Sequence, residues 1–210
     1  YAVKNPQNGK LYTRAQIDAE NFTGRMTPVK CSKHANDSGF CKYCNTKTVC
    51  EHKSADKNGK CKKCGIQFCA EITAGKQQTY FPTWEELCDR VKTLTADDTV
   101  VIWLYQDQEL QEAPALELAA GTVVLDLGGH SYHNGNGSLL KVSGTADITL
   151  QNGTALGSDK ANLITVSGGR LKVEKSVILS CDDKTFYGYS LWASGGDTEI
   201  DGTQVPKGSV

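Results

Sequence analysis

Long apolar runs are missing from this sequence of 210 residues. No stretch approaches the roughly 18 consecutive apolar residues that a membrane-spanning helix needs, so no such segment is expected. A strong excess of charge is also missing, because a net charge of −1 creates no overall field for nucleic acid or an anionic membrane. Methionine occurs once and glycine 21 times, which is typical of turn-rich β structure. The length allows one or two domains with a sizeable core.

What the sequence does contain is a repeat of apolar residues between Val100 and Val205. Alternation of apolar and polar residues, as in Leu125-Asp126-Leu127, turns one face of a strand inward and the other to water. A fixed period of roughly 20–30 residues indicates stacked coils. The predicted inward columns have steps of 23 residues and, at the end of the second column, 27: Ile102, Leu125, Ile148 and Leu171; and Leu104, Leu127, Leu150, Val173 and Ile200.

Two further strand columns and glycine-containing corners complete each predicted coil. The second column comprises 139–142, 163–166 and 190–193, and a weaker third column lies near 131–133, 154–156 and 177–179. Before the first coil, Thr83 and Glu86 form a capping-box pattern that predicts a helix over 84–94. Its apolar face would cover the open end of the stack. The predicted fold is mainly β: a short right-handed parallel β-helix with an N-terminal capping helix, preceded by a small Cys/His zinc-binding segment.

That Cys/His segment lies between Cys31 and Cys64. Spacing divides its cysteines and histidines into two sets, each with three thiols and one imidazole, which is a complete tetrahedral set for zinc. The sets are Cys31, His34, Cys41 and Cys44, and Cys50, His52, Cys61 and Cys64. The intervening loops are polar and form no apolar core, so the segment needs a cross-link to be ordered. Because neither set leaves a ligand position for water, we expect two structural zinc ions and no catalytic metal.

Alternatives for this segment stay open. Disulfides are one, although His34 and His52 would then have no role. The choice between zinc and disulfides concerns the second set above all, because Cys50 and His52 are spaced one residue more tightly than Cys31 and His34. Nucleic-acid binding is another, because 30–64 carries nine lysines. Interleaved aromatic residues are scarce, however, so we expect no nucleic-acid partner and assign the lysines to offsetting thiolate charge. The remaining cysteines are expected to be buried apolar residues, with a disulfide between the first two as an alternative: Cys69, Cys88 and Cys181.

The predicted coils contain no recognisable catalytic set. Stepping by one coil places Asp147, Arg170 and Asp197 over one another, and likewise Thr149, Lys172 and Glu199, so opposite charges alternate along the stack. Glycan-cleaving sites instead gather like-charged carboxylates. We interpret the alternation as a structural ladder. His130 and His133 flank a turn, and the sequence shows no partner for either.

Ligand binding is expected at the loop from Cys181 to Tyr189, where the last full coil is longer than the others. Loops on a rigid scaffold commonly carry binding residues. The candidates combine acids with aromatic rings: Asp182, Asp183, Phe186, Tyr187 and Tyr189. The alternative is a solvated turn whose rings fold over the coil.

The runs 83–87, 99–104 and 124–130, which read TWEEL, TVVIWL and VLDLGGH, resemble the start of pectin-lyase-like β-helix domains. Such domains occur in large secreted surface proteins of Gram-positive gut and oral bacteria, and small Cys/His repeats similar to 31–64 lie beside them. The resemblance covers about 31–205 and implies an extracellular, cell-surface or secreted location. Enzymatic relatives carry catalytic carboxylates or an arginine on the coil face, and that set cannot be placed here.

Together these features predict a non-catalytic extracellular surface module, not an enzyme, for binding or adhesion to glycans or host extracellular proteins, or for structural display. A polysaccharide lyase or glycoside hydrolase of the β-helix class is the alternative. The expected organisation is a leading segment or linker at 1–29, tandem Cys3His zinc knuckles at 30–69, and the capping helix with the parallel β-helix at 75–210. We expect a monomeric piece of a longer chain, with no membrane insertion in this part.

Overall fold

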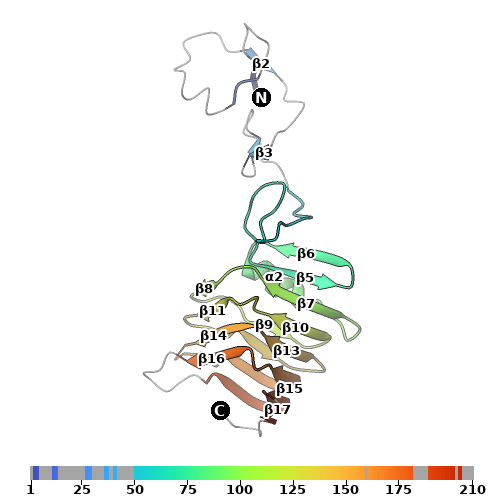
Figure 1. Cartoon of the computed structure of the whole chain (residues 1–210), viewed down its shortest axis with the longest axis vertical. Helices are drawn as coiled ribbons and strands as arrows, with labels where there is room; N and C mark the ends of the chain where they lie inside the picture. The colour runs from blue at the N-terminus through green and yellow to red at the C-terminus, as the bar shows by residue number, and fades with distance from the viewer. Residues whose placement is uncertain are drawn as a thin grey trace. The chain divides into compact units, whose positions relative to one another are not determined.

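A parallel β-solenoid of about four turns dominates the computed structural model of the chain (Figure 1). The structure describes residues 2–4, 11–13, 27–29, 36–37, 40–41, 50–158, 160–181, 189–201 and 203–204, with side chains for 11–13, 50–158, 160–180 and 189–201. The fold prediction of mainly β structure with a parallel coil stack and a Cys/His cluster near the N-terminus is therefore confirmed.

Strands on three sides of each turn pair in parallel with the equivalent strands of the next turn. The first turn consists of β7 (Thr99–Leu104), β8 (Gln108–Leu110) and β9 (Leu116–Leu118), and the second of β10 (Thr122–Asp126), β11 (Ser131–Asn134) and β12 (Leu140–Val142). The third turn consists of β13 (Asp147–Gln151), β14 (Gly153–Gly157) and the start of β15 (Ile164–Val173). The fourth consists of the rest of β15, β16 (Val177–Cys181) and the start of β17 (Leu191–Ile200). A last short strand, β18 (Thr203–Gln204), pairs antiparallel with β17.

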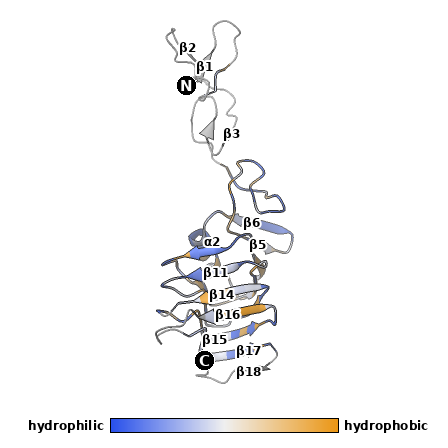
Figure 2. Cartoon of the chain, turned by 60° about the vertical axis from the view of Figure 1, so that its left-hand side comes forward, coloured by the Kyte–Doolittle hydropathy of each residue, from blue (hydrophilic) through white to orange (hydrophobic). Residues whose placement is uncertain are grey.

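The inward columns are apolar and almost fully buried, except for the partly buried Ile200. The stacked strands carry both hydrophobic and hydrophilic residues (Figure 2). The predicted columns are wrong at one step, because Leu125 pairs with Leu150 and not with Ile148. This slip of two residues leaves every inward side chain inward, since strand side chains alternate with a period of two. The observed columns are Val100, Val123, Ile148 and Leu171; and Ile102, Leu125, Leu150, Val173 and Ile200.

The other predicted columns follow the observed register closely. The second column is confirmed by the pairs Leu140–Ile164 and Ile164–Leu191. The third is displaced by one residue at its last step, where Thr154 pairs with Ile178. The alternating charge ladder is also confirmed: Asp147 pairs with Arg170 and Arg170 with Asp197, and the neighbouring column is Thr149, Lys172 and Glu199.

Helix α2 (Trp84–Val91) precedes the first coil, as predicted, but ends three residues before Leu94. The Thr83 side chain accepts a hydrogen bond of 3.3 Å from the Glu86 amide and so caps the helix. The buried face of α2 includes Trp84, whose Nε1 donates to the Pro114 carbonyl at 2.7 Å. Its ring also lies 4.9 Å from that of Tyr132, between centroids, in the next coil. The helix is thereby fixed against the solenoid core.

A β-hairpin that was not predicted covers the first coil together with α2. It consists of β5 (Ala70–Ala74) and β6 (Gln77–Phe81), and β5 pairs antiparallel with β7. Its two-residue turn contains Gly75 with φ of +59°, a conformation typical of tight hairpins. On its β7 side the first coil therefore has its backbone edge paired rather than open to solvent.

By its internal contacts the chain divides into two units. One comprises 1–56 with 60–66, and the other 57–59 with 67–210. The first contains two short antiparallel pairs: β1 (Ala2–Lys4) with β2 (Thr27–Val29), and β3 (Asn36–Asp37) with β4 (Phe40–Cys41). It also contains the described Cys/His cluster.

Candidate functional site

The second Cys/His set is built on a small hairpin-like turn. An isolated antiparallel bridge joins Ala55 to Cys61. The Lys62 amide donates to the Ser54 carbonyl at 3.1 Å, and the Asp56 amide to the Lys60 carbonyl at 2.8 Å. These bonds bring the chain back so that Cys61 comes close to Cys50, eleven residues earlier.

The Cys61–Cys64 pair lies on a tight knuckle. The Gly65 amide donates to the Cys61 carbonyl, and the Cys61 amide to the Ile66 carbonyl, both at 2.8 Å. Gly65 has a φ of +76°, which a residue with a side chain rarely adopts. This reversal directs the Cys61 and Cys64 thiols toward the same point, as their two-residue spacing predicts.

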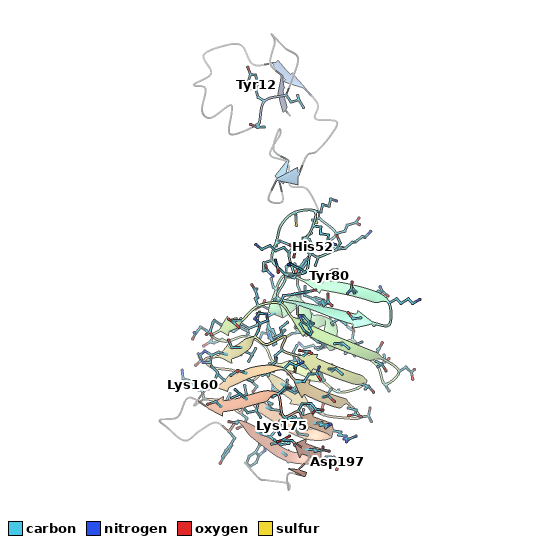
Figure 3. All side chains as sticks on the ribbon, in the orientation of Figure 1. Tyr12, His52, Tyr80, Lys160, Lys175 and Asp197 are labelled. Carbon is cyan, nitrogen blue, oxygen red and sulfur yellow. The ribbon has the colours of Figure 1, made fainter. Side chains whose placement is uncertain are left out.

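Three donor residues of the second set form a cluster that could hold a metal ion, and the fourth, Cys61, lies close to one of them. The ligand atoms of Cys50, His52 and Cys64 all lie within 4.8 Å of one another, and Cys50 Sγ is 3.5 Å from Cys61 Sγ. Zinc–sulfur bonds of about 2.3 Å in a tetrahedron separate the sulfurs by about 3.8 Å. His52, labelled in Figure 3, has a φ of +48°, an uncommon backbone conformation for histidine. These residues therefore fit a metal ion.

The electrostatics of the cluster also favour a cation. Burial acts to raise the pKa of Cys61, but the amides of Cys64 and Lys63 and the thiols of Cys50 and Cys64 hold that pKa below its ordinary value. Burial together with the neighbouring Cys61 and Cys50 thiols raises the pKa of Cys64 to about 11. One thiolate is thus favoured and a second beside it is disfavoured. A bound metal cation would reverse this, since thiolates are the form that ligates metal.

The side chains of the first predicted set lie outside the described residues. The backbone of Cys41 belongs to β4, where it pairs with Asn36, but no side chain of this set is described: Cys31, His34, Cys41 and Cys44. The second metal ion therefore stays a prediction.

The remaining cysteines differ from the cluster in their surroundings. Cys69 and Cys88 are buried in the solenoid core and carry free thiols, as predicted. Burial raises the pKa of each to about 12, so both are neutral at physiological pH. The side chain of Cys181 lies outside the described residues.

A groove of about 400 Å³ lies on the outward face of the β9, β12 and β15 column. Val91, the last residue of α2, and Lys92, its C-cap, border the groove. Its floor consists of residues that succeed one another by one coil: Glu117, Lys141 and Thr165; and Ala119, Ser143 and Ser167. Lys141 Nζ and Glu117 Oε1 form an ion pair at 3.2 Å. The floor is thus polar and rich in hydroxyl groups.

The column of Glu117, Lys141 and Thr165 continues onto an aromatic pair. Thr165 pairs with Trp192 of β17, and the Trp192 ring stacks on Tyr189 with 5.4 Å between centroids. Tyr189 is 39% exposed. It is the one predicted ligand-binding residue among those the structure describes, since Asp182, Asp183, Phe186 and Tyr187 lie outside them. Sequence analysis overlooked both Trp192 and the groove.

The two turn histidines have partners that the sequence did not reveal. His130 Nδ1 lies 3.4 Å from Asp107 Oδ1, and His133 Nδ1 lies 3.1 Å from Glu109 Oε2. Both carboxylates belong to the preceding coil. Each histidine thus forms one exposed pair, and among the described residues neither belongs to a metal-type cluster of three or more His, Cys, Asp or Glu.

Comparison with protein-family models, with curated proteins and with solved structures found no match. Among the described residues, no helix has the length and apolar character needed to cross a bilayer.

Proposed function

We propose that the chain is a non-catalytic extracellular binding module whose solenoid groove holds a glycan. The observation that carries this proposal is the continuous column of Glu117, Lys141, Thr165 and Trp192, with Tyr189 stacked at its end. A row of polar groups that ends on an aromatic ring matches a sugar chain, which has polar edges and apolar ring faces.

The spacing of the column suits a linear ligand. Adjacent coils are separated by about 4.8 Å, a distance close to the length of one sugar ring. Each ring of an extended oligosaccharide would therefore meet one residue of the column. Trp192 would take the face of one ring by stacking, and Lys141 and Thr165 would hydrogen-bond the hydroxyl groups of its neighbours.

The hydroxyl groups beside the column support the same proposal. Ser167 Oγ donates to the Val142 carbonyl at 3.4 Å, and Ser194 Oγ to the Val166 carbonyl at 3.5 Å. The hydroxyl hydrogens of both serines thus point toward the backbone of the preceding coil. The oxygen lone pairs remain as acceptors for sugar hydroxyl groups.

The lack of a paired acid favours binding over cleavage. Glycoside hydrolysis uses two carboxyl groups about 5–9.5 Å apart. The groove lining described here contains a single carboxylate, Glu117, which already pairs with Lys141. The alternative, a polysaccharide lyase or glycoside hydrolase, would recruit Asp182 or Asp183. It predicts turnover of a polysaccharide that Asp182→Ala or Asp183→Ala abolishes.

We further propose that the metal is zinc, with two ions per chain, and that the chain belongs with pectin-lyase-like surface modules of Gram-positive bacteria. The donor set of three sulfurs and one nitrogen supports zinc over harder cations. A closed set also supports a purely structural ion, and the groove residues belong to the other unit of the chain.

A glycan array followed by calorimetry on the best ligand tests the binding proposal. Trp192→Ala should lower the affinity for that ligand at least tenfold, because the stacking of the sugar on the indole is lost. Trp103→Ala, which removes an exposed indole from a different sheet face, serves as the matched control and should bind normally. No ligand on the array would leave only the display role. Equal affinity for Trp192→Ala and the unchanged protein would show that the glycan does not bind along this column.

A further inference from the structure

A second cluster of aromatic side chains surrounds an acid where the β5–β6 hairpin joins the solenoid. On the outward face, Glu71 of β5 pairs with Tyr80 of β6 on one side and with Trp103 of β7 on the other. Residues directly opposite in antiparallel strands have Cβ atoms about 4.5–5.5 Å apart. The Glu71 side chain therefore lies between two aromatic residues; Tyr80 is labelled in Figure 3.

A third aromatic residue completes the cluster and orients the acid. Tyr105 Oη donates to Glu71 Oε2 at 2.5 Å. On the other carboxylate oxygen, Thr73 Oγ1 donates at 3.2 Å and Gln78 Nε2 at 3.5 Å. The carboxylate is held in place by neutral donors, and no described ion pair neutralises its charge.

The rings are fixed before any ligand arrives. Tyr80 stacks on Phe68 with 5.1 Å between centroids. The Tyr105 ring packs against Gly59, where a Cβ would come within 2.3 Å of its Cγ. The Trp103 indole lies over Gly128, which has a φ of +63° and where a Cβ would be 3.2 Å from Nε1. Glycine makes room for both rings, so little conformational entropy remains to be lost on binding.

Charge decides which ligand suits the cluster. The column of Tyr80, Glu71, Trp103 and Asp126 contains two acids and no base, and the column beside it is uncharged: Gln78, Thr73, Val101 and Val124. Aromatic faces also present negative charge to a ligand. A hard metal ion would need more oxygen ligands than Glu71 supplies, because the Asp126 carboxylate is buried and already accepts from Gln151 at 2.6 Å.

We propose that Glu71, Tyr80, Trp103 and Tyr105 form a binding site for an alkylated ammonium group. The aromatic faces would contact the alkyl groups by cation–π attraction, and Glu71 would supply the compensating charge. Trp103 is 38% exposed, and the other three residues are half-buried, so the site is open to a small cation. This inference is independent of the glycan groove, which lies on a different strand column.

The proposal is tested by titrating the whole chain with tetramethylammonium chloride and observing the chemical shifts by NMR. A parallel titration with sodium chloride at the same ionic strength is the control. Saturable binding with a Kd on the order of millimolar is expected for a single exposed aromatic site. Trp103→Leu should weaken it at least tenfold and Trp103→Phe less. Glu71→Gln, which keeps the hydrogen bond to Tyr105 and removes the charge, should weaken it several-fold. Trp192→Leu is the control and should leave the affinity unchanged.

Two further probes separate this mechanism from simpler ones. A neutral tert-butyl alcohol of the same shape should bind far more weakly, because it lacks the charge. Methylammonium should also bind more weakly, since it offers less alkyl surface to the rings. No saturation up to about 100 mM tetramethylammonium, equal binding of the neutral probe, or an unchanged affinity in Glu71→Gln would overturn the proposal. Thermal melts of each variant show whether a loss of binding reflects unfolding, and Glu71→Gln decides the matter if the Trp103 variants do not fold.

Discussion

We predict that removal of the proposed metal unfolds the Cys/His turn and leaves the solenoid intact. Within 50–66, Cys61 is the one apolar side chain that is buried. Burial of so small a group contributes about 1–2 kcal/mol, whereas a structural zinc site contributes an apparent 10–16 kcal/mol, roughly, at neutral pH. The proposed metal would therefore supply nearly all the free energy that orders this turn. The solenoid has its own buried core and should not depend on the metal.

Hydrogen exchange with and without a chelator measures this difference directly. The amides of Asp56, Cys61 and Gly65, each bonded at 2.8 Å within the turn, should exchange at least about 100-fold faster after chelation. The Arg170 amide, bonded to the Ala146 carbonyl at 2.7 Å in the solenoid, should keep its protection. Cys61→Ser should reproduce the effect of the chelator.

The matched control is Cys88→Ala, which removes a buried thiol from the other unit. It should retain the full metal content and the protection of the turn. The reasoning is refuted if chelation leaves the turn protected, or if thiol titration finds the cysteines of the turn already oxidised. Either result would mean that disulfides, and not a metal, order this segment.

Three further predictions concern the solenoid. Leu150→Ala should lower the free energy of unfolding by about 2–5 kcal/mol in denaturant titrations, because Leu150 is fully buried in an inward column; Ile178→Ala, at a side chain 63% exposed, should change it by less than about 0.5 kcal/mol. Gly129→Ala should lower the free energy of unfolding by about 1–2 kcal/mol, from the left-handed backbone alone, because no atom lies within 4 Å of the added Cβ. Gly144→Ala should lower it by about 1–3 kcal/mol more, because its Cβ would lie 2.3 Å from the Ala119 carbonyl oxygen. The Ser131 amide holds the pKa of Asp107 below its ordinary value. Asp107 should therefore stabilise the fold at pH values above its unfolded pKa of about 3.9, and this stabilisation should be lost as the pH falls through the lower folded pKa. Melting temperatures of the unchanged protein and of Asp107→Asn should differ at pH 6 and converge in strong acid.

Each of these has a result that contradicts it. Equal destabilisation by Leu150→Ala and Ile178→Ala would mean that the inward column is not the core. Equal melting temperatures for the two glycine variants would remove the steric argument at Gly144. A difference between Asp107→Asn and the unchanged protein that grows toward low pH would reverse the sign assigned to the Asp107 carboxylate.

Strand periodicity was enough to predict the solenoid, because inward positions tolerate only apolar residues and the repeat is long. It was not enough to predict register. Ile148 and Leu150 are both apolar and inward, so the pattern alone does not say which of them pairs with Leu125. A two-residue slip changes no face, and therefore leaves no mark in the alternation of the sequence.

The features that periodicity missed depend on neighbours distant in the chain. Glu71 and Trp103 are 32 positions apart, and only the antiparallel pairing of β5 with β7 brings them together. The groove likewise combines Lys92 of the segment after α2 with Thr165 of β15. By contrast, Cys61 and Cys64 meet through local turn geometry, and the sequence spacing was sufficient to predict their convergence.

The one-residue-per-coil construction of the groove floor has a consequence for how such a protein can change. Glu117, Lys141, Thr165 and Trp192 each come from a separate winding. Duplication of a single winding would extend the floor by one step and leave the other steps in place. The number of windings would thus set the length of the polymer that the floor can bind. Single side-chain replacements would set which chemical groups of that polymer are recognised.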